Sequence, residues 1–398
     1  MKPRVLYIAS GGIEEPLIIS QVLRYLKRLN KTFATCHLIT LERNMPDNVD
    51  AIRATLKASG IHWHGLPSYK GSRALNLWRE IWNGYRLGKQ LIQQHGLNLI
   101  HARSFIPGNI GLRLAKKTNA KFLYDMRGFW AAEKWAKGTI KWRWMRRQAQ
   151  AMENRLFHGA DSLISLTDAG KHKLVADGIS TPIDVIPCCV DTELFRPDRN
   201  IEPNDGGGPR MISVGALGPG YLPESVLGLY RAACDTAQAK RDEKPPHLTL
   251  LTQTKLAIIE AAAKRVDCSL NDVVIQSATP EDVVRFLNQA DFGLCMIAPS
   301  AAKVASSPTK LAEYLACGLP VIANCKQIGD LQTILDQNNI GVALEDQTPA
   351  GWQTAIESML ELLKDPSVSA RCRQLAVDEF SVDVGVQRYA NVYLRLMD

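Results

Sequence analysis

The sequence has no long apolar run, no CxxC motif and no internal repeat. A membrane-spanning helix needs about 18 or more consecutive apolar residues, and no run approaches that length. The first segment, MKPRVLYIAS, has no extended apolar region, so we expect no signal peptide. Nine cysteines occur without a CxxC pair, which favours free thiols in a reducing cytoplasm over a zinc site.

Composition places the chain among ordinary globular proteins. Hydrophobic residues make up 46% and charged residues 22%, which excludes disordered, collagenous and low-complexity classes. Single hydrophobic cores stop growing near about 250–300 residues, and this chain has 398. We therefore expect two domains.

Positive charge is concentrated in the first half of the chain. Residues 1–199 contain 31 Lys and Arg against 16 Asp and Glu, a net charge of +15, whereas residues 200–398 contain 17 against 24, a net charge of −7. A basic half predicts an anionic partner, and phosphate, an acidic glycan, anionic lipid headgroups and nucleic acid all fit that description.

Short apolar segments of strand type alternate with helical segments along the chain. In the first half the predicted strands are Arg4–Ala9, Phe33–Leu41, Ile61–Leu66, Leu97–Ser104, Lys121–Arg127, Asp161–Thr167 and Ile183–Cys189. In the second half they are Met211–Leu217, His247–Thr252, Val273–Ser277, Phe292–Ala298, Pro320–Asn324 and Ile340–Leu344. This alternation predicts an α/β fold of two doubly wound domains with parallel sheets. Ligands are expected beyond the carboxyl ends of the strands, in the cleft between the domains.

The domain boundary is predicted at a segment with few apolar side chains. Phe195–Arg210 is rich in Pro, Gly, Asn and Asp, a composition typical of linkers. We therefore predict an N-terminal domain over residues 1–195, a linker over 196–209 and a C-terminal domain over 210–380. The last helical segment, Ser381–Met397, is amphipathic.

The segment Ser306–Asn324 carries the strongest local motif. Ser307 is a suitable N-cap and Pro308 suits the first helical position. A Glu or Gln would usually complete a capping box three residues after the N-cap, but Lys310 occupies that position. A cation there opposes the helix dipole unless an anion binds. With Glu313 one turn later, the sequence predicts a phosphate site beside a sugar hydroxyl, and a solvated Lys–Glu pair is the alternative.

Three groups of segments resemble one enzyme family. Glu313–Ile322 (EYLACGLPVI) is similar to the EAMACGxPVI segment of the retaining glycosyltransferase family 4. Ile186–Asp191 with Phe195–Pro197 resembles its IPNGVDxxxFxP hinge, and Asp161–Leu174 resembles a further strand and helix of that family. The resemblance implies the GT-B fold, with two Rossmann-like domains facing a cleft. The first would bind the acceptor, the second the nucleotide-sugar, and the helix over 381–398 would return to the first.

The same resemblance implies a donor site. Glu313 matches the glutamate that holds the nucleotide ribose, and in a sub-branch with an SPxK motif Lys310 neutralises the diphosphate. The first glutamate of the family's E-x7-E motif is replaced by Ala305, which affects recognition of the donor sugar. Glycines in the first domain can approach a phosphate closely, and a plain tight turn is the alternative. The other residues expected at the donor are Gly11, Gly12, Gly215, Ser306, Ser307, Pro308 and Thr309.

Polar residues also follow two strands of the first domain. His101 and Arg103 end one strand, and Arg103 stands where the family often has a histidine that contacts the donor sugar. Arg127 and Glu133 lie in YDMRGFWAAE, which is similar to a segment of the same sub-branch. We predict catalytic or acceptor-side roles for these four residues. A structural histidine and a structural ion pair between Asp125 and Arg127 are the alternatives.

A basic and aromatic segment spans residues 134–147 (KWAKGTIKWRWMRR), with six basic residues, three tryptophans and no acid. Tryptophan favours the lipid headgroup boundary and basic side chains attract anionic lipids, so the segment predicts contact with a membrane or a lipid-linked acceptor. A surface helix is the alternative, and nucleic-acid binding ranks behind both. The residues concerned are Trp135, Lys141, Trp142, Arg143, Trp144, Arg146 and Arg147.

Together these features predict a retaining, metal-independent glycosyltransferase without a cofactor. It would transfer a hexose from a nucleotide-diphosphate sugar, with a UDP-sugar favoured, to a hydroxyl of a glycan or lipid-linked acceptor in cell-surface polysaccharide or glycoconjugate synthesis. Its expected location is the cytoplasm, peripherally on the membrane. A GT-B sugar-nucleotide epimerase or phosphorylase, or a non-catalytic GT-B partner protein, are the alternatives, because fold does not fix function.

Overall fold

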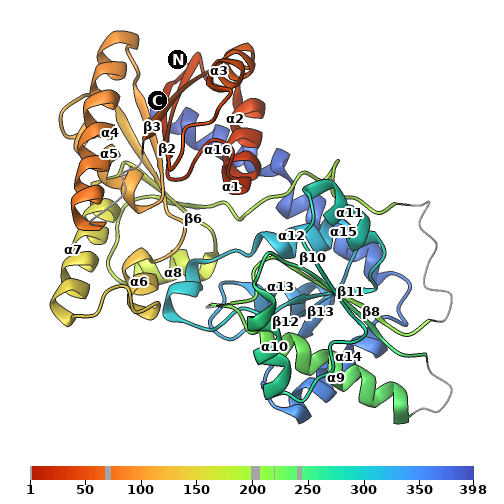
Figure 1. Ribbon diagram of the computed structural model, residues 1–398. Coiled ribbons are helices and arrows are strands. Elements are labelled where there is room, and N and C mark those ends of the chain that lie inside the picture. Colours follow the sequence, from red (N-terminus) through yellow and green to blue (C-terminus); the bar gives the residue numbers. More distant parts are fainter. Residues whose placement is uncertain (1, 68–72, 199–206, 219, 240–243) are drawn as a thin grey trace. The chain divides into compact units, whose positions relative to one another are not determined.

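The computed structural model describes residues 2–67, 73–198, 207–218, 220–239 and 244–398. The chain forms two compact units. The first comprises Met1–Pro187 and Val382–Asp398, and the second comprises Cys188–Ser381. Both ends of the chain therefore belong to the first unit (Figure 1).

The first unit is built on a seven-stranded parallel sheet with the strand order β3-β2-β1-β4-β5-β6-β7. Its strands are β1 (Arg4–Ala9), β2 (Thr35–Glu42), β3 (Ile61–Pro67), β4 (Leu99–Arg103), β5 (Lys121–Asp125), β6 (Ser162–Ser165) and β7 (Ile183–Val185). Each of the seven predicted segments overlaps one of them, and β2 and β3 extend one residue beyond their predicted ends. The central strands are buried along nearly their whole length, because helices cover both faces of the sheet.

The strand order determines which helices share a face. Crossovers between parallel strands are right-handed. Strands before β4 are added on one side of β1 and later strands on the other, so the later helices lie on the opposite face of the sheet. On that face α4 (Arg73–His95), α5 (Phe105–Ala115) and α7 (Arg143–Gly159) pack side by side (Figure 1). The segment after β1 forms α1 (Pro16–Ile18), a π-helical turn η1 (Ile19–Leu23) and α2 (Arg24–Leu29), and α16 (Val382–Met397) packs against α2. The remaining helices are α3 (Val49–Ala58), α6 (Trp130–Ala136) and α8 (Asp168–Ala176).

The second unit repeats this plan with a six-stranded parallel sheet in the order β10-β9-β8-β11-β12-β13. The strands are β8 (Arg210–Val214), β9 (His247–Leu251), β10 (Val273–Gln276), β11 (Phe292–Cys295), β12 (Val321–Ala323) and β13 (Gly341–Ala343). The helices are α9 (Pro223–Ala239), α10 (Leu256–Arg265), α11 (Pro280–Asn288), the 3-10 turn η2 (Ala301–Ala305), α12 (Thr309–Ala316), α13 (Leu331–Asn338), α14 (Pro349–Leu362) and α15 (Val368–Phe380). The predicted pair of Rossmann-like domains is thereby confirmed.

The division between the units falls at Pro187–Cys188, whereas the sequence predicts a first domain that extends to residue 195. Phe195 packs in the hydrophobic core of the second unit, together with Leu315 and Leu319. Part of the predicted linker, residues 199–206, lies outside the described residues. The last helix, α16, belongs to the first unit, as the sequence predicts for 381–398.

Candidate functional site

In each parallel sheet the strand order reverses at one point, and several of the predicted site residues lie at the strand ends or in the loops that follow them there. In the first unit this point lies between β1 and β4, where Ala9 is in register with Arg103. In the second unit it lies between β8 and β11. Loops that follow neighbouring strands diverge at such a point and leave a crevice at the carboxyl edge, where doubly wound sheets bind ligands.

In the first unit a fully buried carboxylate, Asp125 at the end of β5, organises three cationic or potentially cationic side chains. Nη1 of Arg127 lies 3.4 Å from its Oδ1, while Nε of Arg103 and Nε2 of His101 lie 3.9 and 3.5 Å from its Oδ2. The hydroxyl of Tyr389 on α16 donates a hydrogen bond to Oδ2 at 3.0 Å. The structure therefore brings together three of the four predicted catalytic residues around a carboxylate that the sequence reading treats as an ion-pair partner.

The protonation states in this cluster follow from burial and from the neighbouring charges. Burial alone would raise the pKa of Asp125, but the charge of Arg127 and the contacts with His101 and Arg103 hold that pKa well below its usual range. Burial lowers the pKa of His101 and outweighs the opposing effect of Asp125. Nδ1 of His101 lies 2.7 Å from the Tyr393 hydroxyl. At neutral pH the cluster thus contains an ionised Asp125 and an uncharged His101.

Gly11 and Gly12 form the loop after β1, and a buried glutamate positions this loop. The backbone N–H of Ile13 donates to Oε1 and Oε2 of Glu42 at 2.9 and 3.1 Å. A Cβ atom at Gly12 would lie 2.7 Å from Oε2 of Glu42, and Gly11 has φ +115°, so larger residues would displace the loop. Both interpretations of these glycines, a plain tight turn and a loop that a phosphate can approach, are therefore compatible with the structure. The loop is tight, and it lies where the strand order reverses.

Glu133, the fourth predicted catalytic residue, lies on α6. Its carboxylate forms an ion pair with Lys137 at 2.5 Å, one turn further along the chain. Trp130, the first residue of α6, stacks on Phe105, the first residue of α5, with ring centroids 3.8 Å apart. This contact fixes the start of α6 against α5. The carboxylate of Glu153 on α7 accepts the backbone N–H of Trp130 at 2.6 Å. Glu133 is thus held on a well-anchored helix.

In the second unit, Lys310 lies in the first turn of α12. Its ammonium lies 5.0 Å from the centroid of the Tyr221 ring, and a Cβ atom at Gly215 would lie 3.7 Å from Nζ. Burial lowers the pKa of Lys310, opposed by Cys295 and Glu313. Among the described residues Lys310 forms no ion pair with a carboxylate. The half-buried ammonium of Lys310 therefore lies where the strand order reverses, beside Gly215, whose φ is +98°.

The start of α12 differs by one residue from its prediction. Pro308 is the N-cap and the helix begins at Thr309, so the prediction of Ser307 as N-cap is wrong. The Ser307 hydroxyl instead accepts the backbone N–H of Cys188 at 3.2 Å. Since Pro308 has no side chain that can cap the helix, the first-turn N–H groups near Lys310 have no side-chain partner from the N-cap.

Tyr314 ties α12 to the strands on either side. Its hydroxyl accepts the backbone N–H of Val214 at 2.8 Å and lies 3.4 Å from the carbonyl oxygen of Leu294. A Cβ atom at Gly293 would lie 2.4 Å from the Tyr314 ring, so β11 needs glycine there. This anchoring sets the position of Lys310, four residues earlier. Ser306 and Glu313 are half-buried on either side of that turn, whereas Ala305 is fully buried.

The basic and aromatic segment divides into two parts. Trp135 packs with a small core formed by Ala131, Ile140 and Ala149. The side chain of Arg146 lies over the Trp135 ring at 5.0 Å. By contrast Trp142 and Trp144 are 63% and 60% exposed. Lys141, Arg143 and Arg147 are exposed as well. In the described part of the chain, no helix is long and apolar enough to span a membrane.

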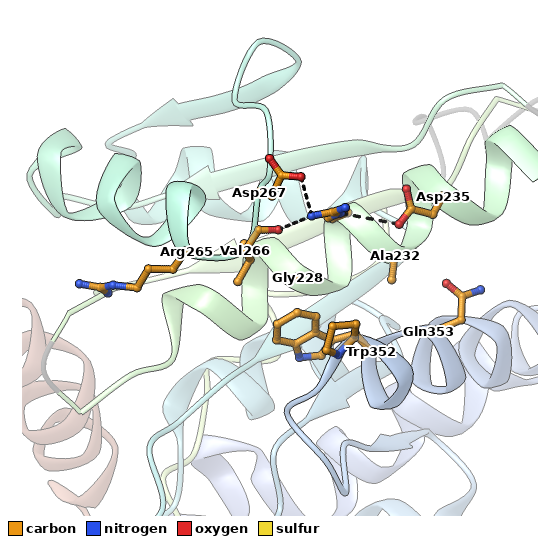
Figure 2. A pocket seen from close by; sticks show the side chains of 10 residues that line it. Gly228, Ala232, Asp235, Arg265, Val266, Asp267, Trp352 and Gln353 are labelled. Carbon is orange, nitrogen blue, oxygen red and sulfur yellow. Dashed lines mark hydrogen bonds and ion pairs between the residues drawn. The ribbon is translucent and has the colours of Figure 1, made fainter.

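A separate pocket of about 370 Å³ lies in the second unit between α9, α14 and the end of α10. Arg231 pairs with Asp267 at 3.0 Å and with Asp235 at 3.8 Å, and Figure 2 shows both of these carboxylates at the pocket. The guanidinium of Arg265 pairs with Glu224. None of the predicted site residues lines this pocket.

Sequence reasoning missed the side chains that reach the site from distant elements. Tyr389 and Tyr393 come from α16, and Tyr221 comes from the loop before α9. Glu42 comes from the end of β2. The only local signal was the spacing of the two α16 tyrosines, which places them on one helix face.

Comparison with known proteins agrees with this architecture. The family model described as Glycosyltransferase Family 4 matches residues 20–194, and the one described as Glycosyl transferases group 1 matches residues 209–362. No curated protein matches the chain. A glycosyltransferase from Rickettsia africae has a similar structure, with 16% identity, coverage of 100% of this chain and 99% of that one, and a TM-score of 0.71. Sucrose-phosphate synthase from Thermosynechococcus elongatus is 16% identical, with coverage of 99% of each chain and a TM-score of 0.73. HepE from Anabaena in complex with UDP and glucose is 13% identical, with coverage of 99% of this chain and 100% of that one and a TM-score of 0.67.

The two parallel sheets, each with one reversal of strand order, and the similar solved structures define a two-domain α/β protein with the GT-B fold. Each half of the chain matches a glycosyltransferase family model, and the whole chain has the GT-B fold.

Proposed function

We propose that this protein is a retaining, metal-independent hexosyltransferase of the SPxK sub-branch. It transfers a sugar from a nucleotide-diphosphate sugar, with UDP favoured as the nucleotide, to a hydroxyl of a glycan or lipid-linked acceptor in cell-surface polysaccharide or glycoconjugate synthesis. The observation that carries the proposal is Lys310, a half-buried cation without a carboxylate partner among the described residues, beside Gly215 and the N-terminal turn of α12.

The leaving diphosphate defines the chemical role of this part of the second unit. Glycosyl transfer passes through an oxocarbenium-like state as the bond to the diphosphate breaks. Charge that develops on the leaving group is stabilised by preorganised donors and cations. Lys310 supplies a cation and the start of α12 supplies backbone N–H groups. Glu313, one turn later, is suited to accept hydrogen bonds from ribose hydroxyls.

The Asp125 cluster supports an acceptor-side role for the first unit. His101 is uncharged and buried, and one ring nitrogen lies near the Tyr393 hydroxyl while the other lies near Asp125. This geometry fixes the ring and makes His101 a positioning group, held by α16. The cationic Arg103 and Arg127 provide the charge at the carboxyl edge. Glu133 on α6 remains the predicted acceptor-side carboxylate.

A nucleotide screen followed by one substitution tests the donor proposal. UDP, GDP, ADP and CMP are compared by thermal shift, because a ligand that binds the native state raises the melting temperature. With the nucleotide that binds, Lys310→Ala should weaken diphosphate binding about tenfold or more, since charge-assisted contacts contribute about 1.5–3 kcal/mol. Binding of the corresponding nucleoside should not change.

Lys326→Ala, which removes an exposed lysine of the same unit, is the matched control. Equal weakening of nucleotide and nucleoside would contradict the phosphate role of Lys310. If no nucleotide or nucleotide-sugar binds, a non-catalytic GT-B partner becomes the better reading. Turnover of a nucleotide-sugar without any acceptor would instead favour an epimerase.

We also propose peripheral association with the cytoplasmic face of an anionic membrane. Two exposed aromatic groups support it: Trp142 and Trp144 at the start of α7, and Trp78 and Trp82 near the start of α4, which stack at 6.0 Å. Both helices follow strands of one parallel sheet, so both begin at its carboxyl edge. Exposed tryptophans with neighbouring basic residues suit the lipid headgroup boundary.

Vesicle sedimentation tests this association. Changing both Trp142 and Trp144 to Ser should reduce binding to vesicles containing anionic phosphatidylserine, and added salt should reduce it further. Leu256→Ser, which removes a 52% exposed apolar side chain of the second unit, is the control. Unchanged sedimentation of the double variant would remove the proposed membrane contact.

A further inference from the structure

Arg103 is a buried arginine whose Nε donor has no hydrogen-bond acceptor among the described residues. The residue is 7% exposed, and its Nε is buried without a hydrogen-bond partner. The distance from its Nε to Oδ2 of Asp125, 3.9 Å, is too long for a hydrogen bond. A guanidinium carries five donors, and leaving buried donors unsatisfied costs free energy. The cost is offset if a ligand supplies the missing acceptors.

The helix that follows Arg103 offers further unsatisfied donors. Ser104 is the N-cap of α5 and makes no side-chain capping hydrogen bond. The backbone N–H groups of Phe105 and Ile106 belong to the first turn, where no intrahelical acceptor is available, and Pro107 has no N–H. Eleven residues of helix add the positive end of the helix dipole at this point.

Backbone strain marks the same turn. Ser104 has φ 81°, a left-handed value that non-glycine residues seldom adopt. Its N–H donates to the carbonyl oxygen of Asp125 at 2.9 Å, which holds the strained turn against β5. Strain of this kind is retained where the surrounding structure fixes it, often at binding sites. The turn aligns the helix start with the end of β4, which carries Arg103.

The charges in the cluster do not cancel. Arg103 and Arg127 contribute two positive charges, and Asp125 contributes one negative charge. His101 is uncharged at neutral pH. These four side chains together therefore carry one net positive charge, which a compact anion would neutralise.

We propose that Arg103 and the N-terminus of α5 bind an oxyanion carried by the substrate. The shared chemistry is a planar or tetrahedral group with several acceptor oxygens. It comes either from the carboxylate of a uronic acid or from a phosphate ester. This inference deepens the proposed function, on which it rests for the nature of the substrate. It concerns different residues from the nucleotide site at Lys310, so each can fail alone.

Binding of small probes to the full chain tests the inference directly. Glucuronate and glucose 6-phosphate are titrated at constant ionic strength against the Lys310→Ala protein, which lacks the proposed diphosphate site, with glucose as the neutral match. The expected result is saturable binding of one acid and no binding of glucose, measured by calorimetry. Binding of glucuronate alone assigns the anion to a uronic acid, and binding of glucose 6-phosphate alone assigns it to a phosphate ester. Binding of neither acid, or equal binding of glucose, overturns the inference.

Substitution locates the binding. Arg103→Gln should weaken the bound acid at least tenfold, whereas Arg103→Lys, which keeps the charge, should weaken it less. Arg113→Gln, which changes an exposed arginine on the same helix, should have no effect. The melting temperature without ligand shows whether each variant is folded. Unchanged affinity in a folded Arg103→Gln protein overturns the assignment to Arg103.

Discussion

The two units share a sheet topology but differ in whether the cations at the reversal of strand order have a carboxylate counter-charge. In the first unit, buried Asp125 provides a counter-charge for Arg103 and Arg127. In the second unit, Lys310 faces Tyr221 and Gly215 and has no carboxylate partner among the described residues. The first centre offsets part of its positive charge with its own carboxylate, whereas the second has no carboxylate within ion-pair distance among the described residues and leaves its whole charge to a ligand. The same sheet topology can therefore carry a centre that contributes to stability through its own ion pairs, or a centre whose charge is kept for a ligand at some cost in stability.

The physical basis of this contrast is the cost of desolvation. A buried charge is costly unless it is paired and hydrogen-bonded, so removing Asp125 would leave cations uncompensated. A lysine without an ion pair already carries that cost in the folded state, as its lowered pKa indicates. The two centres should therefore respond in opposite ways when one charge is removed.

The largest effect is expected at Asp125. Asp125→Asn keeps the shape but removes the carboxylate that faces Arg103, Arg127 and the Tyr389 hydroxyl. Breaking a buried ion pair costs about 3–5 kcal/mol, so we expect the free energy of unfolding to fall by about that amount. Chemical denaturation measures it.

The control for this substitution is Asp177→Asn, which breaks a surface pair with Lys173 and should change stability by less than about 1 kcal/mol. Equal effects of the two substitutions would contradict a structural role for the buried carboxylate and would remove the main difference between the units.

Acid should destabilise the first unit before the second. Seven of the eight histidines lie in the first unit, and four of them, His37, His62, His64 and His95, form a stacked cluster with centroids 4.2–5.3 Å from that of His37. Burial, and then the charges of the neighbouring histidines, lower the pKa of His37 to about 3. Burial likewise lowers the pKa of His64 to about 4.

The sign of the effect follows from these depressed values. The unfolded chain protonates its histidines near pH 6.5, whereas the folded cluster resists protonation until the pH is much lower. This contribution to stability is therefore full above about pH 6.5 and is lost progressively as the pH falls toward 4. Hydrogen exchange at pH 7 and 4.5 should show lost protection in the first unit. In His37→Gln the change between the two pH values should be smaller, and an unchanged profile would contradict the assignment.

Two tyrosine hydroxyls compare the units more finely. Tyr389→Phe removes a hydrogen bond to the ionised Asp125, and bonds to charged groups contribute about 1.5–3 kcal/mol. Tyr314→Phe removes the acceptor of the Val214 N–H, a neutral bond that contributes about 1 kcal/mol. We expect the first substitution to lower the denaturation midpoint more than the second. The reverse order would show that α12 depends on its anchor more than the Asp125 cluster depends on α16.

The sequence was sufficient for the fold but not for the contacts that complete the sites. Continuous apolar strands alternating with helices indicated both sheets, and each of the 13 predicted segments overlaps a strand, because burial on two faces leaves a direct mark on composition. The contact between Asp125 and Tyr389 joins residues 264 positions apart, so no local pattern could reveal it. The N-cap was misplaced by one residue because Ser307 accepts a hydrogen bond from Cys188, which is 119 positions away.

The smallest expected effect on stability is at Lys310, and its sign sharpens the contrast with Asp125. Lys310→Met keeps a long unbranched side chain beside Tyr221 while removing a desolvated charge that has no ion pair among the described residues. The free energy of unfolding should therefore stay the same or rise by up to about 1 kcal/mol, as happens when a site residue is retained for binding at the expense of stability. Thermal unfolding without ligand, measured alongside the Lys326→Met control, checks this. A loss of more than about 2 kcal/mol would show that Lys310 has a structural partner comparable to Asp125, and the two units would then manage their central charges in the same way.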